Sequence, residues 1–132
     1  MSYGMAAALQ AAVFTRLAEF PALSEVPVLD APPTGGPGGT FVVIGPEDVR
    51  DASDKSGAGA AHRLMITVVS DRDGFQAAKE VAVAVSDALD DAPLELDRGR
   101  LVNISFQRAV ARRLDEGAMR RIDLTFRARV EA

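Results

Sequence analysis

The sequence lacks cysteine and contains a single histidine, and these are two residue types on which many small enzymes and metal sites depend. It contains no cysteine, which excludes disulfide bonds, thiolate catalysis and zinc sites built on cysteine. Its one histidine, His62, leaves almost no material for a catalytic triad or a histidine-rich metal site, and we expect it at the surface or at the edge of a strand. We therefore expect no catalytic residues, no metal site and no cofactor.

Long apolar runs are also missing. The longest weakly polar stretch near the start, Ala6 to Phe14, spans nine residues, contains Gln10 and follows no basic leader, so it predicts neither a signal peptide nor a membrane span. Arginine outnumbers lysine 13 to 2, as is typical of a GC-rich bacterial genome. With 132 residues, 48% of them hydrophobic, the chain predicts a single domain, residues 1–132, in the bacterial cytoplasm.

A glycine- and proline-rich stretch, "DAPPTGGPGG" at 30–39, raises the question of a phosphate-binding loop. Such a loop needs a lysine after the glycines and a helix whose amide end completes the site. Residues 1–54 contain no lysine, and Thr40 leads into the apolar run "FVVI" of a strand. The stretch is therefore interpreted as a connection between two strands, without a phosphate site.

Two amphipathic helices are predicted. Leu9, Val13 and Leu17 recur every fourth residue, which indicates a helix over Met5–Phe20 that ends at Pro21. A second helix begins after Asp73, which stands three residues before Gln76 in a capping-box arrangement, and it ends near Asp90.

Strands are expected at 26–30, at 40–45, where Gly45-Pro46 closes a buried apolar run, and at 62–70. Residues 47–61 are charged, then small and glycine-rich, and they predict a long flexible loop or hairpin tip.

The last third of the chain predicts a long β-hairpin. A three-residue loop at 115–117, with Gly117 in the left-handed position, places Leu114 opposite Ala118. Counting outward pairs Phe106 with Phe126, and it makes one face of the hairpin apolar. By the same count Ile104 faces Ala128, Val102 faces Val130, Val110 faces Ile122 and Arg108 faces Leu124. The other face is polar and mostly basic, and its members are Asn103, Ser105, Gln107, Arg113, Arg121, Asp123, Thr125, Arg127 and Arg129.

Charge is divided unevenly along the chain. Residues 1–97 hold 6 basic and 15 acidic side chains, whereas residues 98–132 hold 9 basic and 4 acidic ones. This asymmetry suits a protein that contacts copies of itself head to tail or presents a basic face to an acidic partner, and a solvated arginine-rich face is an equally simple interpretation. An acidic cluster at 87–97 leaves open an alternative, a small cation- or ligand-binding domain or enzyme that uses Asp87, Asp90, Asp91, Glu95 and Asp97.

The order of these segments resembles the tail-completion, or tail-terminator, proteins of long-tailed bacteriophages and gene transfer agents. The resemblance covers nearly the whole chain, and the segments that carry it are "MAAALQAAVFTRLAEFPAL", "VPVLDAPPTGGPGGTFVVIG", "HRLMITVVSDRDGFQAAKEVAVAVSDAL" and "RIDLTFRARV". It implies an α+β fold, with two helices packed on one side of a mostly antiparallel sheet. It further implies a hexameric ring that caps the completed tail tube and docks it to the head-side connector, while DNA passes through the central hole without sequence-specific binding. The protein would then begin in the cytoplasm and end in the particle.

Interface residues are expected in two places. We expect Arg113, Arg121, Arg127 and Arg129 of the hairpin to lie at contacts between subunits or rings, because arginines clustered around a hole would grip phosphates and hinder the passage of DNA. The 47–61 loop is expected to become ordered against a neighbour, and its candidate contact residues are Arg50, Asp51, Asp54 and Lys55.

Overall fold

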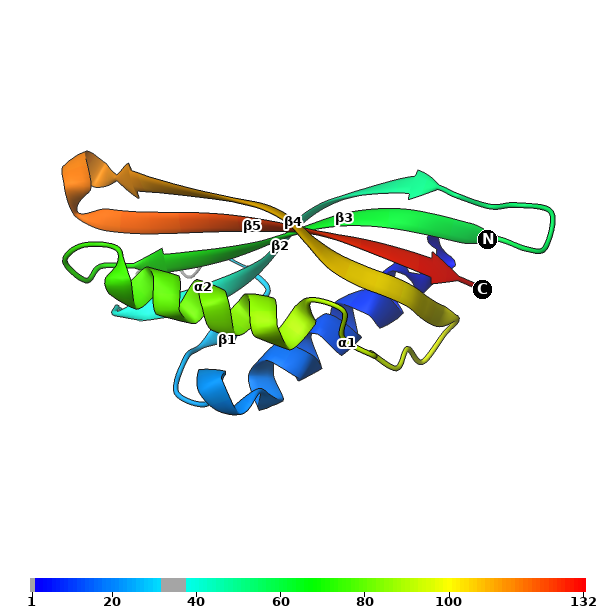
Figure 1. Ribbon diagram of the computed structural model, residues 1–132, viewed down its shortest axis with the longest axis horizontal. Helices are drawn as coiled ribbons and strands as arrows, with labels where there is room; N and C mark the ends of the chain where they lie inside the picture. The colour runs from blue at the N-terminus through cyan, green and yellow to red at the C-terminus, as the bar shows by residue number, and fades with distance from the viewer. Residues whose placement is uncertain (1, 32–37) are drawn as a thin grey trace.

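Five strands form one twisted sheet, and two α-helices cover one of its faces in the computed structural model, which describes residues 2–31 and 38–132 (Figure 1). The sheet order is β1-β2-β3-β5-β4, and only β1 and β2 pair in parallel. The expected α+β class, with a mostly antiparallel sheet and a C-terminal hairpin, is confirmed. The strands are β1 (Val28–Leu29), β2 (Thr40–Asp51), β3 (Gly59–Ser70), β4 (Arg100–Leu114) and β5 (Met119–Glu131).

The helices are α1 (Ala6–Glu19) and α2 (Gln76–Leu89), with short 3-10 turns at Ser2–Met5, Pro21–Leu23 and Asp115–Gly117. Helix α1 buries Leu9, Val13 and Leu17, as their spacing predicts. Within the described residues, none of the helices is long and apolar enough to cross a membrane.

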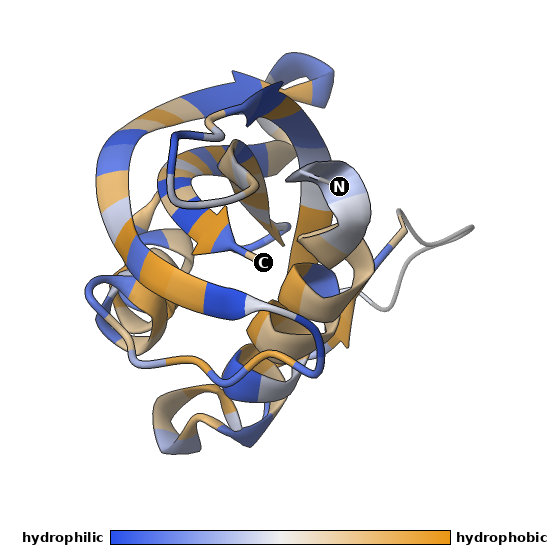
Figure 2. Cartoon of the chain, turned by 90° about the vertical axis from the view of Figure 1, so that its right-hand side faces the viewer, coloured by the Kyte–Doolittle hydropathy of each residue, from blue (hydrophilic) through white to orange (hydrophobic). Residues whose placement is uncertain are grey.

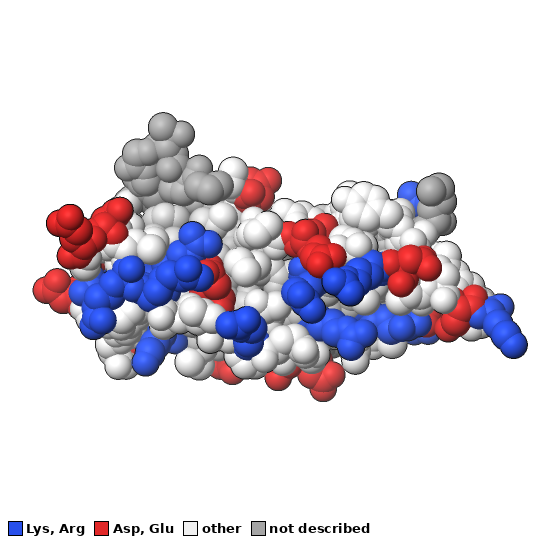
Figure 3. Space-filling view, turned by 90° about the horizontal axis from the view of Figure 1, so that it is seen from above, with Lys and Arg blue, Asp and Glu red and all other residues white. Residues whose placement is uncertain are grey.

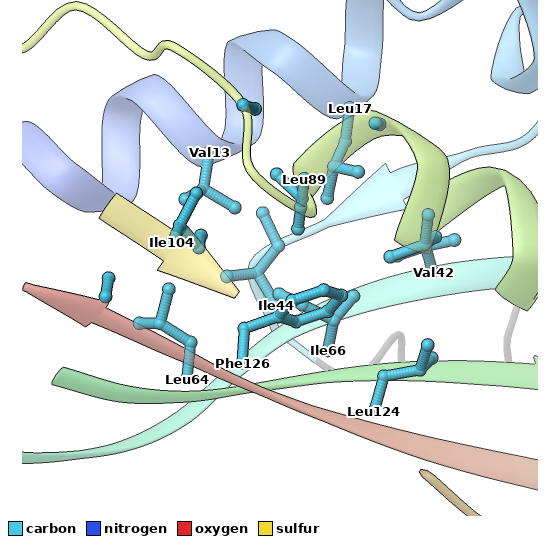
Figure 4. Packing of buried hydrophobic residues seen from close by; sticks show 14 of the residues in the cluster. Val13, Leu17, Val42, Ile44, Leu64, Ile66, Leu89, Ile104, Leu124 and Phe126 are labelled. Atoms are coloured by element: carbon cyan, nitrogen blue, oxygen red, sulfur yellow. The ribbon is translucent and has the colours of Figure 1, made fainter. Parts of the chain in front are cut away.

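The core fills the space between the sheet and the helices. Phe126 of β5 is fully buried at its centre, beside Ile44 of β2 and Ile66 of β3 (Figure 4). Helix α2 connects β3 to β4 and crosses over β5, which lies between them in the sheet. Hydrophilic and hydrophobic residues alternate along the strands in Figure 2, as expected when only one face of a sheet is covered.

The β2–β3 hairpin differs from the loop predicted at 47–61. Strand β2 continues through Gly45 and Pro46 to Asp51, and β3 begins at Gly59, so only residues 52–58 connect them. The register shifts between Ile44 and Glu47, and this β-bulge accommodates a proline, which has no amide hydrogen to donate. The hairpin-tip alternative therefore describes this segment better than a long loop.

The start of α2 also differs from the prediction. Asp73 makes no capping hydrogen bond, because the chain turns at Gly74, where φ is +69°, and the residue at the N-cap is Phe75. The helix ends at Leu89, as expected. Asp90 follows it, and its Oδ1 accepts a hydrogen bond of 2.9 Å from the backbone N–H of Phe106 on the edge strand β4.

The C-terminal hairpin has the predicted register only in its middle. Phe106 pairs with Phe126 and Ile104 with Ala128, as counted from the sequence. Towards the turn the register slips by one, so that Leu114 pairs with Met119, Ala111 with Ile122, Ala109 with Leu124 and Arg108 with Thr125; towards the other end Leu101 pairs with Val130. The causes are two bulges, between Leu101 and Asn103 and between Phe106 and Arg108, and a turn that holds one residue more than predicted. The expected positive φ of Gly117 is present, at 93°.

Candidate interaction surface

The sheet face that points away from the helices carries a concentration of arginine. Directly paired residues on neighbouring strands share a face, so the register assigns each side chain. We call this surface the basic face, and Figure 3 looks onto it. Its arginines are Arg50, Arg63, Arg108, Arg112, Arg121, Arg127 and Arg129, and its acidic residues are Asp48 and Asp123.

Asp123 organises one end of the basic face. Its side chain is only 4% exposed, and its Oδ1 accepts hydrogen bonds from Thr67 Oγ1 at 2.7 Å and Arg121 Nε at 2.9 Å. Its Oδ2 accepts a third bond, of 3.1 Å, from Arg112 Nη2. Arg112 and Arg121 are direct cross-strand partners, so the carboxylate between them offsets the repulsion of two like charges.

A second cross-strand arginine pair lies further along the sheet. Arg63 of β3 is paired with Arg127 of β5, and both side chains are exposed. Among the described residues, neither guanidinium has a carboxylate within 4.0 Å. Arg50 and Asp48 lie beside them but are 3.9 Å apart and well exposed, so their mutual attraction is weak.

Local hydrogen bonds hold the β2–β3 tip, which we define as residues 51–58. Arg129 donates from Nη2 to the carbonyl oxygen of Ala52 at 3.0 Å and lies 3.8 Å from Asp54. The hydroxyl and the backbone N–H of Ser56 donate to Asp54, and they lower the pKa of that carboxyl below its ordinary value of 3.8. The hydroxyl of Ser53 lowers the pKa of Asp51 in the same way.

The predicted interface residues are only partly brought together. Arg121, Arg127, Arg129 and Arg50 share the basic face, whereas Lys55 lies at the exposed tip. Arg113 is on the helix side instead, and its guanidinium lies 5.2 Å from the centre of the Phe75 ring. The bulge after Phe106 causes this error, because one extra residue transfers every later side chain of β4 to the opposite face.

Three arginines of the basic face were absent from the prediction. Arg108 and Arg112 are on this face because of the same bulge, for which the sequence carries no signal. Arg63 precedes the buried Leu64, so the alternation along its strand could have assigned it to the outer face.

The alternative cation site gains no support. Within residues 2–31 and 38–132, no three acidic or histidine side chains are grouped so that they could hold a metal ion. Asp90 instead has the structural contact to β4 described above.

The prediction that His62 lies at the surface is wrong. Its side chain is fully buried on the helix side, where Nδ1 lies 3.3 Å from Glu47 Oε2. It is buried because β3 starts earlier than predicted and pairs on both sides.

The glycine-rich connection leads directly into β2, so no helix follows the glycines and the order expected from the sequence is confirmed. Most of this connection, residues 32–37, lies outside the described residues. Near its ends the basic face has a hollow of about 770 Å³, and the lining includes Phe41, Val43, Val69 and Met119.

Comparisons with known proteins place the chain in a family. The model of the family described as "Tail completion protein gp17" matches residues 11–131. A chain solved in the "Virion of native gene transfer agent (GTA) particle" is 57% identical, with 99% of this chain and 100% of that chain covered and a TM-score of 0.89. A second solved chain, 17% identical over 96% of both chains with a TM-score of 0.66, shares the fold. No curated protein gives a significant match.

The family match spans most of the sequence, from the middle of α1 to the end of β5, and the virion chain is similar along its entire length. Both matches agree with the resemblance to tail-completion proteins that the order of the sequence segments indicates. The family is structural and not enzymatic. The chain belongs to the tail completion protein gp17 family.

Proposed function

We propose that this chain is the tail terminator of a gene transfer agent or a similar phage-like particle. Several copies, six by the family resemblance, form a ring that caps the completed tail tube and joins it to the head-side connector. The observation that carries the proposal is the full-length similarity, at 57% identity, to a chain solved in a gene transfer agent virion. The protein accumulates in the bacterial cytoplasm during assembly and then becomes part of the particle.

The distribution of charge supports a ring of identical subunits. The basic face lies on the outer side of the sheet, whereas the helices lie on the other side, where Glu19, Glu95 and Asp97 line a groove beside α1. Opposite charges on different sides of one subunit favour a head-to-tail contact, and a repeated head-to-tail contact closes a ring when its rotation allows. Arg121 and Arg127 then belong to the contact between neighbouring copies.

The basic face is not the lining of the DNA channel in this proposal. Each arginine that grips a phosphate adds to the affinity and to its salt dependence, which would hinder the movement of DNA through a ring. Arginines turned towards the next subunit avoid that cost. The β2–β3 tip, with Asp51, Asp54 and Lys55, projects at one end of the molecule (Figure 1) and is proposed to contact the tube protein or the connector protein.

The test is a head–tail joining experiment. Particles from a strain that lacks this gene are examined by electron microscopy before and after addition of the purified protein. The proposal expects separate heads and tails before addition and joined particles afterwards. Joined particles in the untreated deletion lysate would show that the protein has another role.

A further inference from the structure

We propose that the Arg63–Arg127 pair on the basic face receives a carboxylate from the next copy of this chain, supplied by an acidic groove beside α1. We call this groove, between α1 and residues 93–97, the α1 groove. The inference rests on the proposed ring and names the two surfaces that meet in it.

Another arginine pair in the same sheet shows how a carboxylate can serve the Arg63–Arg127 site. The cross-strand pair of Arg112 and Arg121 is bridged within the subunit by Asp123, whose carboxylate contacts both guanidinium groups and offsets their mutual repulsion. Arg63 and Arg127 are also a direct cross-strand pair, but no carboxylate of the described residues lies within 4.0 Å of either. Like charges in this position are destabilising, and a carboxylate from outside would remove the repulsion.

The surface around this pair has room for such a group. A hollow of about 190 Å³ is lined by Asp48, Arg50, Ala61, His62, Arg63 and Arg127. Arg50 is the third guanidinium of this set, and Asp48, the cross-strand partner of Arg63 on β2, is its one carboxylate among the described residues, so three positive charges line the hollow with one negative charge.

The α1 groove has the complementary character. It has a volume of about 380 Å³, a floor that includes Ala8, Ala11 and Ala12, and the exposed carboxylates of Glu19, Glu95 and Asp97 around it. Of the described residues in its lining, Arg16 alone is basic. Its Nε donates to the carbonyl oxygen of Ala88 at 2.7 Å, and its guanidinium lies over the Phe20 ring.

The exposed side of α1 is also suited to contact with another protein. From Ala6 to Thr15 the helix has no charged residue, and Phe14 remains 38% exposed. A helix that is apolar on its outer side as well as its inner side is typical of a helix buried in an assembly.

The two surfaces are placed for a head-to-tail contact. Figure 1 shows the sheet on one side of the molecule, with α1 and the segment that follows α2 on the other. One copy can therefore offer its basic face to a second copy while its own α1 groove receives a third.

A second copy fits the basic face better than DNA does. Half-buried apolar side chains, Met65, Val69 and Val110, lie among the arginines of this face. Apolar groups between charged ones are typical of a surface that contacts another protein, whereas a duplex presents mainly phosphates.

The test is a charge exchange in the full chain. Strains whose only copy carries Arg127→Glu, Glu95→Arg or both changes are scored for joined particles, and the self-association of each purified protein is measured by sedimentation. We expect each single reversal to lower the yield of joined particles at least about tenfold, and the double variant to recover most of the loss because every contact regains opposite charges. Arg72→Glu and Asp87→Arg, exposed residues outside both surfaces, are the matched controls and should have no effect.

Other results would overturn either the proposed contact or the proposed function. Circular dichroism and thermal melting exclude variants that fail to fold. If the gene is needed for joining but both single reversals join normally, or if the double variant is no better than the single ones, this contact is wrong while the terminator role stands. If the wild-type protein binds duplex DNA at 0.15 M salt and Arg127→Glu abolishes only that binding, the basic face serves DNA and the inference fails. Joining without the gene would remove the proposed function itself.

Discussion

Arg112 on the exposed edge strand donates a hydrogen bond of 3.1 Å to Asp123, whose carboxylate is almost completely buried on the neighbouring strand. No helix covers the sheet face at this point, and the side chains that contact the Asp123 carboxylate are Thr67, Arg112 and Arg121. The aliphatic parts of long arginine side chains cover apolar surface while their guanidinium groups reach solvent. This ion-pair network therefore fixes the arrangement of one end of the basic face.

Removal of the central carboxylate should destabilise the fold. Asp123→Ala deletes the acceptor of three hydrogen bonds, leaves the Thr67 hydroxyl without that partner and exposes Arg112 and Arg121 to mutual repulsion. We expect the free energy of unfolding to fall by about 2–4 kcal/mol. Urea denaturation measures it. Asp48→Ala, at an exposed position of the same face, should change it by about 0.5 kcal/mol or less, and equal effects of the two variants would contradict the network.

Phe126 should dominate the stability of the core. Its ring is fully buried and meets the Phe106 ring edge to face, with centroids 6.0 Å apart. Phe126→Ala should cost about 3–5 kcal/mol, because it leaves a cavity between sheet and helices. Phe106 is 40% exposed, so Phe106→Ala should cost only about 1–2 kcal/mol. Denaturation midpoints compare the two, and a larger loss for Phe106→Ala would place the core elsewhere.

Ser56 should control the acidity of Asp54. The Ser56 hydroxyl is the main cause of the lowered pKa of Asp54, so Ser56→Ala should raise that pKa towards 3.8. Because the carboxyl binds its proton less tightly in the folded tip, its stabilising contribution is present above about pH 3.8 and is lost as the pH falls through the lower folded pKa. Carboxyl titration by NMR measures this shift. Ser53→Ala should raise the pKa of Asp51 and leave that of Asp54 unchanged; a common shift would refute separate control.

The β2–β3 tip should be the first site of tryptic cleavage. Lys55 is exposed in the short connection, whereas Arg50 is held in the ladder opposite Ala61. Trypsin should therefore cut the isolated subunit after Lys55 before it cuts after Arg50, and assembly into particles should protect the site. Lys55→Gln is the control that removes the cut. Identical cleavage of free and assembled protein would argue against a contact at the tip.

The sequence predicts those helices and strands in which one face is buried, because burial of one face imposes a regular spacing on the apolar residues. Leu9, Val13 and Leu17 mark α1 because that face packs on the core, and Phe106 and Phe126 pair as counted because the stretch between the two bulges is regular. The outer half of β2 has the sequence pattern of a loop, because only Val49 among residues 47–51 packs against the core. The end of a hairpin that is surrounded by solvent has few buried residues, so its sequence shows little of the apolar alternation that predicts a strand.

The candidate surface was harder to predict than the fold. A bulge changes which residues share a face, and the register shift between Phe106 and Arg108 has no local motif that marks it. That is why Arg113 was placed on the wrong face and Arg112 was missed. Arg121 and Arg127, on the regular strand β5, were placed correctly relative to each other.

In the proposed assembly, copies of this chain form a ring at the head–tail junction, with the basic face of one copy against the next. Electron cryo-microscopy of intact particles, with this chain fitted into the density, tests it directly. We expect one ring between the tail tube and the connector, with Arg63 and Arg127 of each copy beside the α1 groove of its neighbour. Density for this chain away from the junction, or a ring whose basic faces line the channel, would contradict it.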